Sequence, residues 1–406
     1  QYNKFFLYIS LLVAFLIGMV SADNLFILLM AWGLCNSMLI LLMKHKSAWQ
    51  AAKASSILTT KIYLLGFVFI TTGCCLLYTA TGESSIKLIV QHNTESPMIV
   101  CGLLFLVLGA MTESAIWPFH KWLLSSLNAP TPVSAIMHAG LVNGGGFLLA
   151  RFAPLYCNAP QILTIMFAIG LATALIATLW KLVQNDVKRM LACSTMAQMG
   201  FMMAQCGLGL FPMAIAHLCL HGLFKAYLFL ASGSAAEEKR IDLAYPPTLT
   251  SFFCALLCGA AGSYSFAWVD NKQWLAHDTT LVIMFVAFVT SSQFSLSILI
   301  KKPILRIPLA AIAASMFGGF YGLNVHCIEY FIAPMNLLHP QPINAVHILG
   351  MVLLMLSWLA ILFGRKITNQ KNIPDWMIKI YVHIVNASQP HRTTITTHHN
   401  HYKYLS

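Results

Sequence analysis

HLCLHGLFKAYLFLASGS, residues 217–234, is apolar enough to lie in a bilayer and yet carries three ionisable side chains. His217, His221 and Lys225 lie four residues apart, and this spacing stacks side chains on one face of a helix. Ionisable groups inside a membrane segment are costly, so a row of three predicts a functional role. We interpret the row as a proton or cation relay. The alternative is a packed polar seam between helices, satisfied by hydrogen bonds.

The composition of the whole chain fits a membrane protein. Of its 406 residues, 58% are hydrophobic and only 9% are charged, and the mean hydropathy is +0.74. Soluble domains carry about 25% charged residues. We therefore predict an all-α polytopic membrane protein with about twelve transmembrane helices, some of them broken. The predicted spans are residues 5–22, 24–43, 56–80, 97–115, 133–153, 161–181, 188–208, 212–235, 248–267, 279–300, 307–323 and 344–364.

The net charge of +12 is distributed as in a membrane protein, which argues against nucleic acid as a partner. Most positive residues follow even-numbered spans, as Lys44, Lys46 and Lys53 follow the second. The positive-inside rule places these loops and both termini in the cytoplasm. The chain begins at Gln1 rather than Met, and its first apolar run has no cleavage signature. We expect a membrane span there and no signal peptide, with a truncated N-terminus.

A prolonged break is predicted between the fourth and fifth spans, at residues 113–135. Pro118 is expected to break a helix, and Pro130 and Pro132 to stop one. Glu113, His120 and Lys121 lie in this segment. A broken helix is tolerated at membrane depth only where protein buries it or where it lines a wet cavity, and transporters bind ions at such breaks. The alternative is an amphipathic helix on the membrane surface.

Other polar residues lie inside or beside the predicted spans. His138 and Asn143 are inside the fifth span, followed by three consecutive glycines, 144–146, that favour close helix packing. Lys61 is either an ion-path residue or a side chain that extends to the nearby membrane surface. Asp186, just before Lys188, is expected to cap a helix.

Residues 365–406 form a predicted cytoplasmic tail after a transmembrane domain of residues 1–364. Residues 375–385, DWMIKIYVHIV, are expected to form a short interfacial helix. We expect the rest of the tail to dock onto a soluble partner. The tail histidines lack a fixed zinc-ligand spacing, and the eleven cysteines of the chain include no CxxC pair, so no metal site is predicted. These histidines are His391, His398, His399 and His401.

Four segments occur in an order that resembles the proton-translocating membrane subunits of respiratory complex I and the Mrp-type cation/proton antiporters. They are ESAIWPFHKWL (113–123), APTPVSAIMHAG (129–140), NDVKRMLACSTMAQMGFM (185–202) and the stretch at 217–234. The resemblance covers residues 25–240 and implies the antiporter-like fold of those subunits. It also implies an ion path formed by Glu113, Lys121, His138, His217, His221 and Lys225, with Lys61, His120, Asn143 and Lys188 as additional candidates.

The sequence departs from that family at three positions that bear on ion exchange. Glu113-Ser114-Ala115 stands where these subunits usually have Lys-Ser-Ala. Trp32 is followed by Gly33 rather than by an acid. The segment beginning at Lys61 lacks the family's Asp. The expected glutamate–lysine exchange is therefore rewired, and Glu113 is expected to pair with Lys121 or Lys225.

The segment HAGLVNGGGFLLARFAPL, residues 138–155, resembles DabB, the membrane subunit family of two-component inorganic carbon accumulators. That resemblance implies a bacterial inner (cytoplasmic) membrane protein without enzymatic activity or a cofactor of its own. It implies a partner, a DabA-like soluble zinc protein on the cytoplasmic face, which hydrates CO2 while this chain conducts protons or Na+. Three alternatives remain open: a complex I pump subunit, an Mrp-type antiporter subunit, and a membrane anchor whose polar residues are only structural.

Overall fold

The computed structural model describes residues 2–46, 48–92, 96–236, 246–299, 304–368 and 374–395. The chain forms two compact units. Unit 1 contains the described residues within Gln1–Ala204, His217–Ala236 and His383–Ser406. Unit 2 contains those within Gln205–Ala216 and Glu237–Val382. The region predicted as one domain, residues 1–364, is thus divided between two units.

A helix occupies each of the twelve predicted spans, so the all-α prediction is confirmed over the described chain. Ten helical stretches in this part of the chain are long and apolar enough to cross a membrane. The other two predicted spans are the shorter α5 and the more polar α11. In chain order the helices of the spans are α1 (Tyr2–Ser21), α2 (Leu25–Met43), α3 (Gln50–Thr81), α5 (Pro97–Glu113), α7 with α8 (Thr131–Ala139 and Gly144–Arg151), α10 (Pro160–Leu182), α11 (Val187–Gly207), α12 (Phe211–Leu230), α13 (Leu249–Val269), α14 (Thr280–Leu299), α15 (Ile307–Ile332) and α16 (Ala345–Thr368).

The predicted break between α5 and α7 is present and is largely buried in protein, with Trp117, Pro118 and Lys121 exposed. Helix α5 ends at Glu113, and the chain turns at Ala115, whose φ is 51°. A short helix, α6 (Lys121–Ser125), follows and buries Trp122, whose indole Nε1 donates to the Thr112 carbonyl at 2.9 Å. This burial agrees with a broken helix and contradicts the surface-helix alternative.

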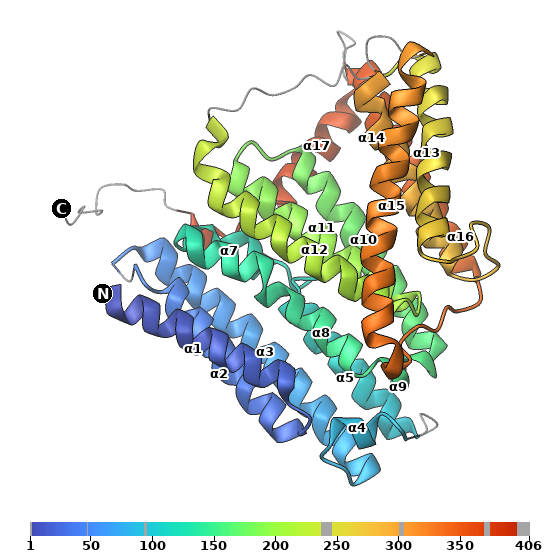
Figure 1. Ribbon diagram of the computed structural model, residues 1–406. Coiled ribbons are helices and arrows are strands. Elements are labelled where there is room, and N and C mark those ends of the chain that lie inside the picture. The colour runs from blue at the N-terminus through green and yellow to red at the C-terminus, as the bar shows by residue number, and fades with distance from the viewer. Residues whose placement is uncertain are drawn as a thin grey trace. The chain divides into compact units, whose positions relative to one another are not determined.

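A second break, which the sequence did not predict, divides the fifth span. Helix α7 ends at Ala139, a 3-10 turn covers Leu141–Asn143, and α8 begins at Gly144. A Cβ atom on Gly145 would lie 2.4 Å from the Ala110 carbonyl oxygen of α5. Only glycine permits this approach, which Figure 1 shows as α5 and α8 running side by side. The glycines therefore serve close packing, as predicted.

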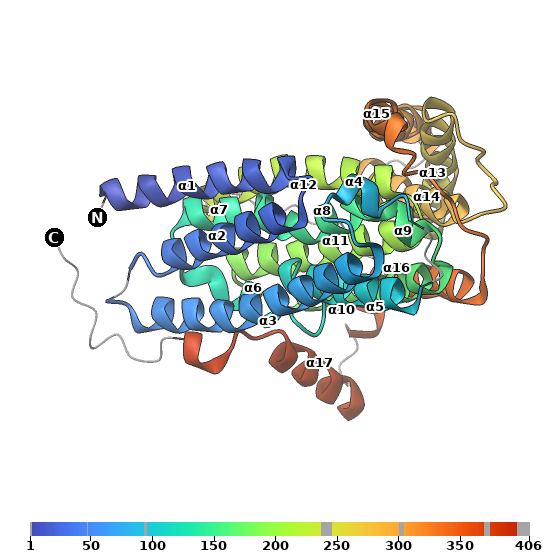
Figure 2. The same cartoon turned by 90° about the horizontal axis from the view of Figure 1, so that it is seen from below.

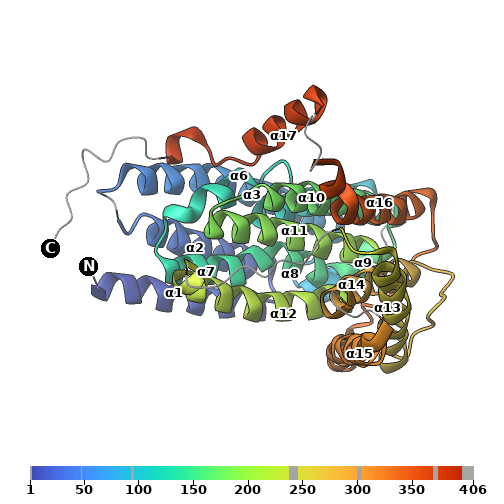
Figure 3. The ribbon, with the colours of Figure 1, turned by 90° about the horizontal axis from the view of Figure 1, so that it is seen from above.

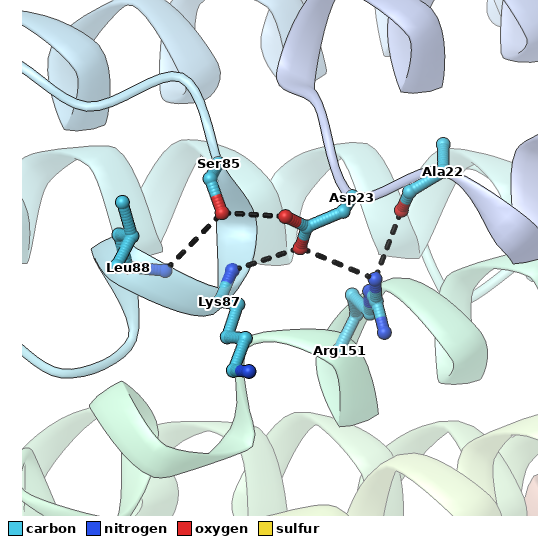
Figure 4. A network of polar contacts seen from close by, with 6 residues as sticks. All are labelled: Ala22, Asp23, Ser85, Lys87, Leu88 and Arg151. Atoms are coloured by element: carbon cyan, nitrogen blue, oxygen red, sulfur yellow. Dashed lines mark hydrogen bonds and ion pairs between the residues drawn. The ribbon is translucent and has the colours of Figure 1, made fainter.

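In unit 1, polar contacts join the turn between α1 and α2 to the short helix α4 (Ile86–Ile89) and to the end of α8. Helices α1, α2 and α3 run side by side (Figure 2). In the turn between α1 and α2, Asp23 accepts hydrogen bonds from the Ser85 hydroxyl and the Lys87 N–H, beside α4. Arg151 at the end of α8 donates to the Ala22 carbonyl at 2.9 Å and lies 3.7 Å from Asp23 (Figure 4). Arg151 thus fastens α8 to this turn.

In unit 2, helices α13, α14 and α15 pack on one another through small residues (Figure 3). A Cβ atom on Gly318 would lie 2.0 Å from the Gly262 carbonyl oxygen, so α15 and α13 touch along their backbones. At the start of α14, the Thr279 hydroxyl donates to the Leu208 carbonyl at 2.7 Å and accepts from the Gln341 N–H at 2.9 Å.

The described part of the predicted tail forms the end of α16, helix α17 and a segment that ends in a 3-10 turn at Arg392–Thr394. Helix α17 (Asp375–Ala387) has no buried residue and exposes Trp376 and Tyr381, and its place at a membrane interface stays a prediction. Residues 388–395 then bond to other parts of unit 1. His391 N–H donates to Ser125 Oγ, and Asn128 Nδ2 donates to the Thr394 carbonyl, both at 2.9 Å. His398, His399 and His401 lie outside the described residues.

Candidate functional site

Glu113 closes α5 at a buried position in unit 1. Its carboxyl Oε2 accepts a hydrogen bond from Trp32 Nε1 at 3.4 Å and one from Asn36 Nδ2 at 3.3 Å. Trp32 and Asn36 are four residues apart on α2, so both face Glu113 from one side of that helix. The Cα of Gly144 lies on another side, because a Cβ atom there would be 3.2 Å from Glu113 Cγ. The carboxyl is enclosed by α2 and by the start of α8.

The 3-10 turn between α7 and α8 extends from the surroundings of Glu113 to helix α12. Asn143 Nδ2 donates to the Ala139 carbonyl at 2.9 Å and to the Leu218 carbonyl of α12 at 3.4 Å. On α12, Gly222 permits a close approach, since a Cβ atom there would lie 2.8 Å from the Ala139 carbonyl oxygen. Asn143 Oδ1 is buried and has no hydrogen-bond partner among the described residues. The second break thus brings a polar group between Glu113 and the row on α12.

His138 and Lys225 meet through one carbonyl oxygen of α11. Lys225 Nζ donates to the Leu191 carbonyl at 3.2 Å, and Thr195 Oγ1 donates to the same oxygen at 3.0 Å. His138 Nδ1 lies 3.2 Å from Thr195 Oγ1. Because the Thr195 proton is directed to Leu191, His138 Nδ1 must carry the hydrogen, which leaves Nε2 as an acceptor. Nε2 has no hydrogen-bond partner among the described residues.

His217 and His221 continue the row along α12. Their rings are nearly parallel, with centroids 6.0 Å apart, and His221 Nε2 lies 3.2 Å from the His138 carbonyl oxygen. A carbonyl only accepts, so His221 Nε2 carries a hydrogen. His217 Nε2 is buried without a hydrogen-bond partner in the described chain. These polar groups lie on neighbouring helices of unit 1, and together with Glu113 we call them the buried row. It consists of Glu113, Asn143, His217, His221, His138, Thr195 and Lys225.

The buried row contains an acid and a base that have no ion pair. Glu113 is 4% exposed and Lys225 is 1% exposed. Among the described residues, neither lies within ion-pairing distance of an opposite charge. The predicted pairing of Glu113 with Lys121 or Lys225 is therefore not formed. A charged side chain at the centre of a membrane costs about 2.5–3.5 kcal/mol on insertion scales, so an unpaired buried lysine is expected to have a function.

Three of the candidate lysines lie apart from the buried row. Lys121 and Lys61 are exposed, so their side chains point away from the interior of unit 1. Lys121 forms no ion pair with Glu113, because seven residues separate the end of α5 from the start of α6 and turn the Lys121 side chain toward the surface. Lys188 Nζ donates to Thr131 Oγ1 at 3.2 Å and so joins α11 to the start of α7.

His120, a candidate for the ion path, contributes to packing, and Asp186, the predicted helix cap, contributes to a helix end. His120 is buried, with its ring centroid 4.8 Å from that of Trp180 on α10. Asp186 Oδ1 accepts from the Arg189 N–H at 2.8 Å at the start of α11, which confirms its predicted capping role. His120 thus packs on α10 rather than in the buried row.

Trp32, Asn36 and Thr195 contact the site although the sequence did not indicate them. Trp32 and Asn36 have the four-residue spacing of a helix face, which is a usable signal. The sequence gave no signal for Thr195, because a threonine in a membrane helix usually bonds within its own helix. Among the described residues, no group of three or more His, Cys, Asp or Glu side chains is placed to hold a metal ion.

The segment that contains the site also identifies the family of this chain. The sequence pattern of the NADH:quinone oxidoreductase/Mrp antiporter transmembrane family matches residues 22–246, more than half of the chain. The chain belongs to this family. Every residue of the buried row falls inside the matched segment. Membership of the family and the membrane-spanning helices together show a multi-pass membrane protein.

Two relatives show to which proteins this chain is similar. It is 40% identical over 247 residues to a probable inorganic carbon transporter subunit, DabB1, of Halothiobacillus neapolitanus, covering 59% of this chain and 44% of that one. It is 30% identical over 382 residues to NADH-quinone oxidoreductase subunit L of Campylobacter jejuni, covering 89% of this chain and 59% of the relative. The chain spans less than half the length of the DabB relative.

The fold is shared with a solved antiporter assembly. The Mrp complex from Dietzia sp. DQ12-45-1b matches with a TM-score of 0.54 at 21% identity, covering 94% of this chain and 40% of that chain. At this identity the likeness concerns the fold alone. It agrees with the antiporter-like architecture predicted from the sequence.

Proposed function

We propose that this chain is the membrane subunit of an inorganic carbon uptake complex, in which it conducts protons or Na+ down their gradient. The observation that carries the proposal is the buried row, because it contains a buried Glu113 and a buried Lys225, neither of which has an ion pair among the described residues. The 40% identity to subunits named DabB supports inorganic carbon as the transported substance.

Proton movement along the row requires groups that both accept and donate. His138 Nε2 is a free acceptor, His217 Nε2 has no hydrogen-bond partner among the described residues, and Lys225 is the basic group of the row. A proton that reaches His138 Nε2 makes Nδ1–H a stronger donor to Thr195, whose oxygen shares the Leu191 carbonyl with Lys225. Asn143 links this end of the row to the surroundings of Glu113.

The driving force is sufficient for a nearly one-way step. A membrane potential of about 100 mV acting on one charge supplies about 2.3 kcal/mol, which corresponds to a bias of about 50-fold. Coupled to CO2 hydration in a soluble zinc partner on the cytoplasmic face, this bias would retain bicarbonate inside the cell. The partner, the zinc and the hydration step are supported by the resemblance of residues 138–155 to the DabB family.

Growth rescue tests this function directly. The full chain is expressed in a bacterium that lacks carbonic anhydrase. The candidate partner protein, taken from the organism that encodes this chain, is expressed with it. We expect growth at ambient CO2 that disappears when either protein is omitted and when an uncoupler dissipates the gradient. Failure to grow with both proteins present and assembled in the membrane would refute the proposal.

A second candidate is a pump or antiporter subunit without a role in carbon uptake. The coverage of 89% of this chain by the alignment to the Campylobacter jejuni subunit favours it, because that alignment also includes α13 to α15. The distinguishing measurement is cation/proton exchange by the purified protein in liposomes without a partner. Exchange without any growth rescue would support the second candidate.

A further inference from the structure

Helix α13 of unit 2 ends in a turn that brings an acid and a base together. Asn271 adopts the left-handed conformation, with a φ of 52°, and reverses the chain after Asp270. The Lys272 N–H then returns to the Ala267 carbonyl at 2.9 Å, and the Asn271 N–H bonds to Trp268 at 3.4 Å. This pair of bonds is the Schellman arrangement that closes helices. It places the side chain of Lys272 beside the carboxyl of Asp270.

A second carboxylate reaches the same lysine from α15. Lys272 Nζ lies 2.7 Å and 2.9 Å from the two carboxyl oxygens of Glu329 and 3.1 Å from Asp270 Oδ2. The Asp270 side chain is fully buried. Two carboxylates therefore share one cation, and the Lys272 ammonium is the N–H group that faces the more enclosed of the two. Burial of a carboxylate that shares its cation with a second carboxylate favours the form that binds a proton.

We propose that Asp270, Lys272 and Glu329 form a proton-binding site at the end of α13, which holds one proton on its carboxylates and releases it in alkaline surroundings. With the proton bound, the cluster is neutral: Lys272 is positive, Glu329 is negative and Asp270 is uncharged. Release of the proton from Asp270 leaves a net charge of −1. This site is separate from the buried row and does not depend on the transported substance proposed above.

The electrostatics of the cluster agree with this assignment. Burial is the main cause that raises the pKa of Asp270 from 3.8 to about 7, Lys272 lowers it, and Glu329 raises it. Among the described residues, the ionisable groups that face Asp270 are Lys272 on the following turn, and Glu329 and Tyr321 on α15. Proton exchange at this site therefore falls near neutral pH.

The cluster lies where a loop leaves α13, so a proton on Asp270 affects how that loop is held to α15. Lys272 begins the loop that runs to Thr279, which bonds to the Leu208 carbonyl just before α12. Glu329 holds the start of that loop to α15. An added negative charge at Asp270 competes with Glu329 for Lys272, so the bound proton favours the attachment of the loop to α15.

Infrared spectroscopy of the purified full-length protein in liposomes tests the site. The C=O stretch of a protonated carboxyl is followed between about pH 5 and about pH 9. We expect a band that is lost as the pH rises and is missing in Asp270→Asn. Asp278→Asn is the matched control, because it changes a carboxylate on the same loop and keeps an acceptor for the Thr280 N–H. Glu113→Gln identifies the band of Glu113, the other buried carboxyl of the described chain.

Two further variants keep the test decisive if Asp270→Asn does not fold. Glu329→Gln removes a like charge, so the midpoint of the Asp270 band should move to lower pH by about one pH unit. Lys272→Met removes the cation, so the midpoint should move to higher pH by a similar amount. Opposite shifts would support a proton shared by the cluster. A band unchanged in both variants, or one that persists in a folded Asp270→Asn protein, would overturn the proposal.

Discussion

Thr195 is the residue through which His138 on α7 and Lys225 on α12 are connected. Its hydroxyl oxygen faces His138 Nδ1 at 3.2 Å while its proton goes to the Leu191 carbonyl, which Lys225 also contacts. Valine has nearly the same shape but neither function, so it removes the connection with little change in packing. This makes Thr195 a sensitive test of how the buried row works.

We predict that Thr195→Val lowers ion transport while the protein still assembles. The change leaves His138 Nδ1–H without an acceptor and removes the hydroxyl between His138 and the Leu191 carbonyl. A hydrogen bond of about 1–3 kcal/mol that is lost from the transition state of proton movement lowers the rate by about 5-fold to about 150-fold. Transport in liposomes and the amount of assembled protein are measured together. Thr178→Val is the control, since the Thr178 hydroxyl donates to the Ala174 carbonyl of its own helix, α10. Equal transport by both variants would contradict a role for Thr195 in the relay.

At the scale of elements, the contact between α5 and α8 fixes the position of Glu113. Ser114 Oγ donates to the Val142 carbonyl at 2.6 Å, just after Glu113 and just before α8. Gly145 allows the two backbones to touch at Ala110. Any atom inserted between these helices displaces the carboxyl from Trp32 and Asn36.

Gly145→Ala is predicted to destabilise the protein by about 1–3 kcal/mol, because its Cβ atom would lie 2.4 Å from the Ala110 oxygen. Thermal unfolding in detergent measures the effect as a lower Tm. Gly364→Ala on α16 has open space around its Cβ position and should be neutral or stabilising, because alanine is the better helix former. If Gly145→Ala unfolded at the temperature of the wild-type protein, the close contact would be wrong.

The network around Asp23 ties the turn after α1 to α4 and α8 and gives a dependence on pH (Figure 4). The pKa of Asp23 lies below its usual 3.8, chiefly because the Ser85 hydroxyl bonds the ionised carboxylate, with the Lys87 N–H and Arg151 adding to the effect. A lowered pKa in the folded state stabilises the fold above the unfolded value. That stabilisation is lost as the pH falls through the folded value.

Asp23→Asn is therefore expected to reduce the Tm at neutral pH, and the difference from wild type should shrink below about pH 4. The measurement is thermal unfolding across this range. Combining Asp23→Asn with Ser85→Ala should cost less than the sum of the single changes, since both remove the same bond. A difference that grows in acid would show that the ionised form of Asp23 does not stabilise the fold.

The sequence predicted the helices well and their breaks only in part. Twenty-residue apolar runs locate spans, and Pro118 located the first break. The second break, at Gly140, was missed because a glycine within an apolar run is also compatible with a continuous helix. The face of Lys121 was not predictable either, because helical spacing cannot be carried across the turn that precedes it.

Within the site, spacing predicted contacts along one helix and failed between helices. His217, His221 and Lys225 share a face of α12 as their spacing requires. The partners of Glu113 come from α2, 77 and 81 residues earlier in the chain, and no single sequence indicates such a distant pair. The Asp270–Lys272–Glu329 cluster was not predicted for the same reason, because it joins a turn after α13 to a residue on the distant helix α15.

At the scale of the whole molecule, the two units differ in how they hold charge. Unit 1 contains Glu113 and Lys225 without an ion pair among the described residues. Unit 2 contains a carboxylate pair that shares Lys272. The first arrangement suits charge that moves, and the second suits a proton that is held.

Lys225→Met in the full chain, expressed with its partner, tests that claim most directly. Inorganic carbon uptake and complex assembly are measured in the same cells, with Lys61→Met as control because Lys61 is exposed on α3. We predict that Lys225→Met assembles normally and loses uptake by at least about 10-fold, while Lys61→Met keeps both. Normal uptake by an assembled Lys225→Met complex would contradict the relay and leave the buried row a structural feature.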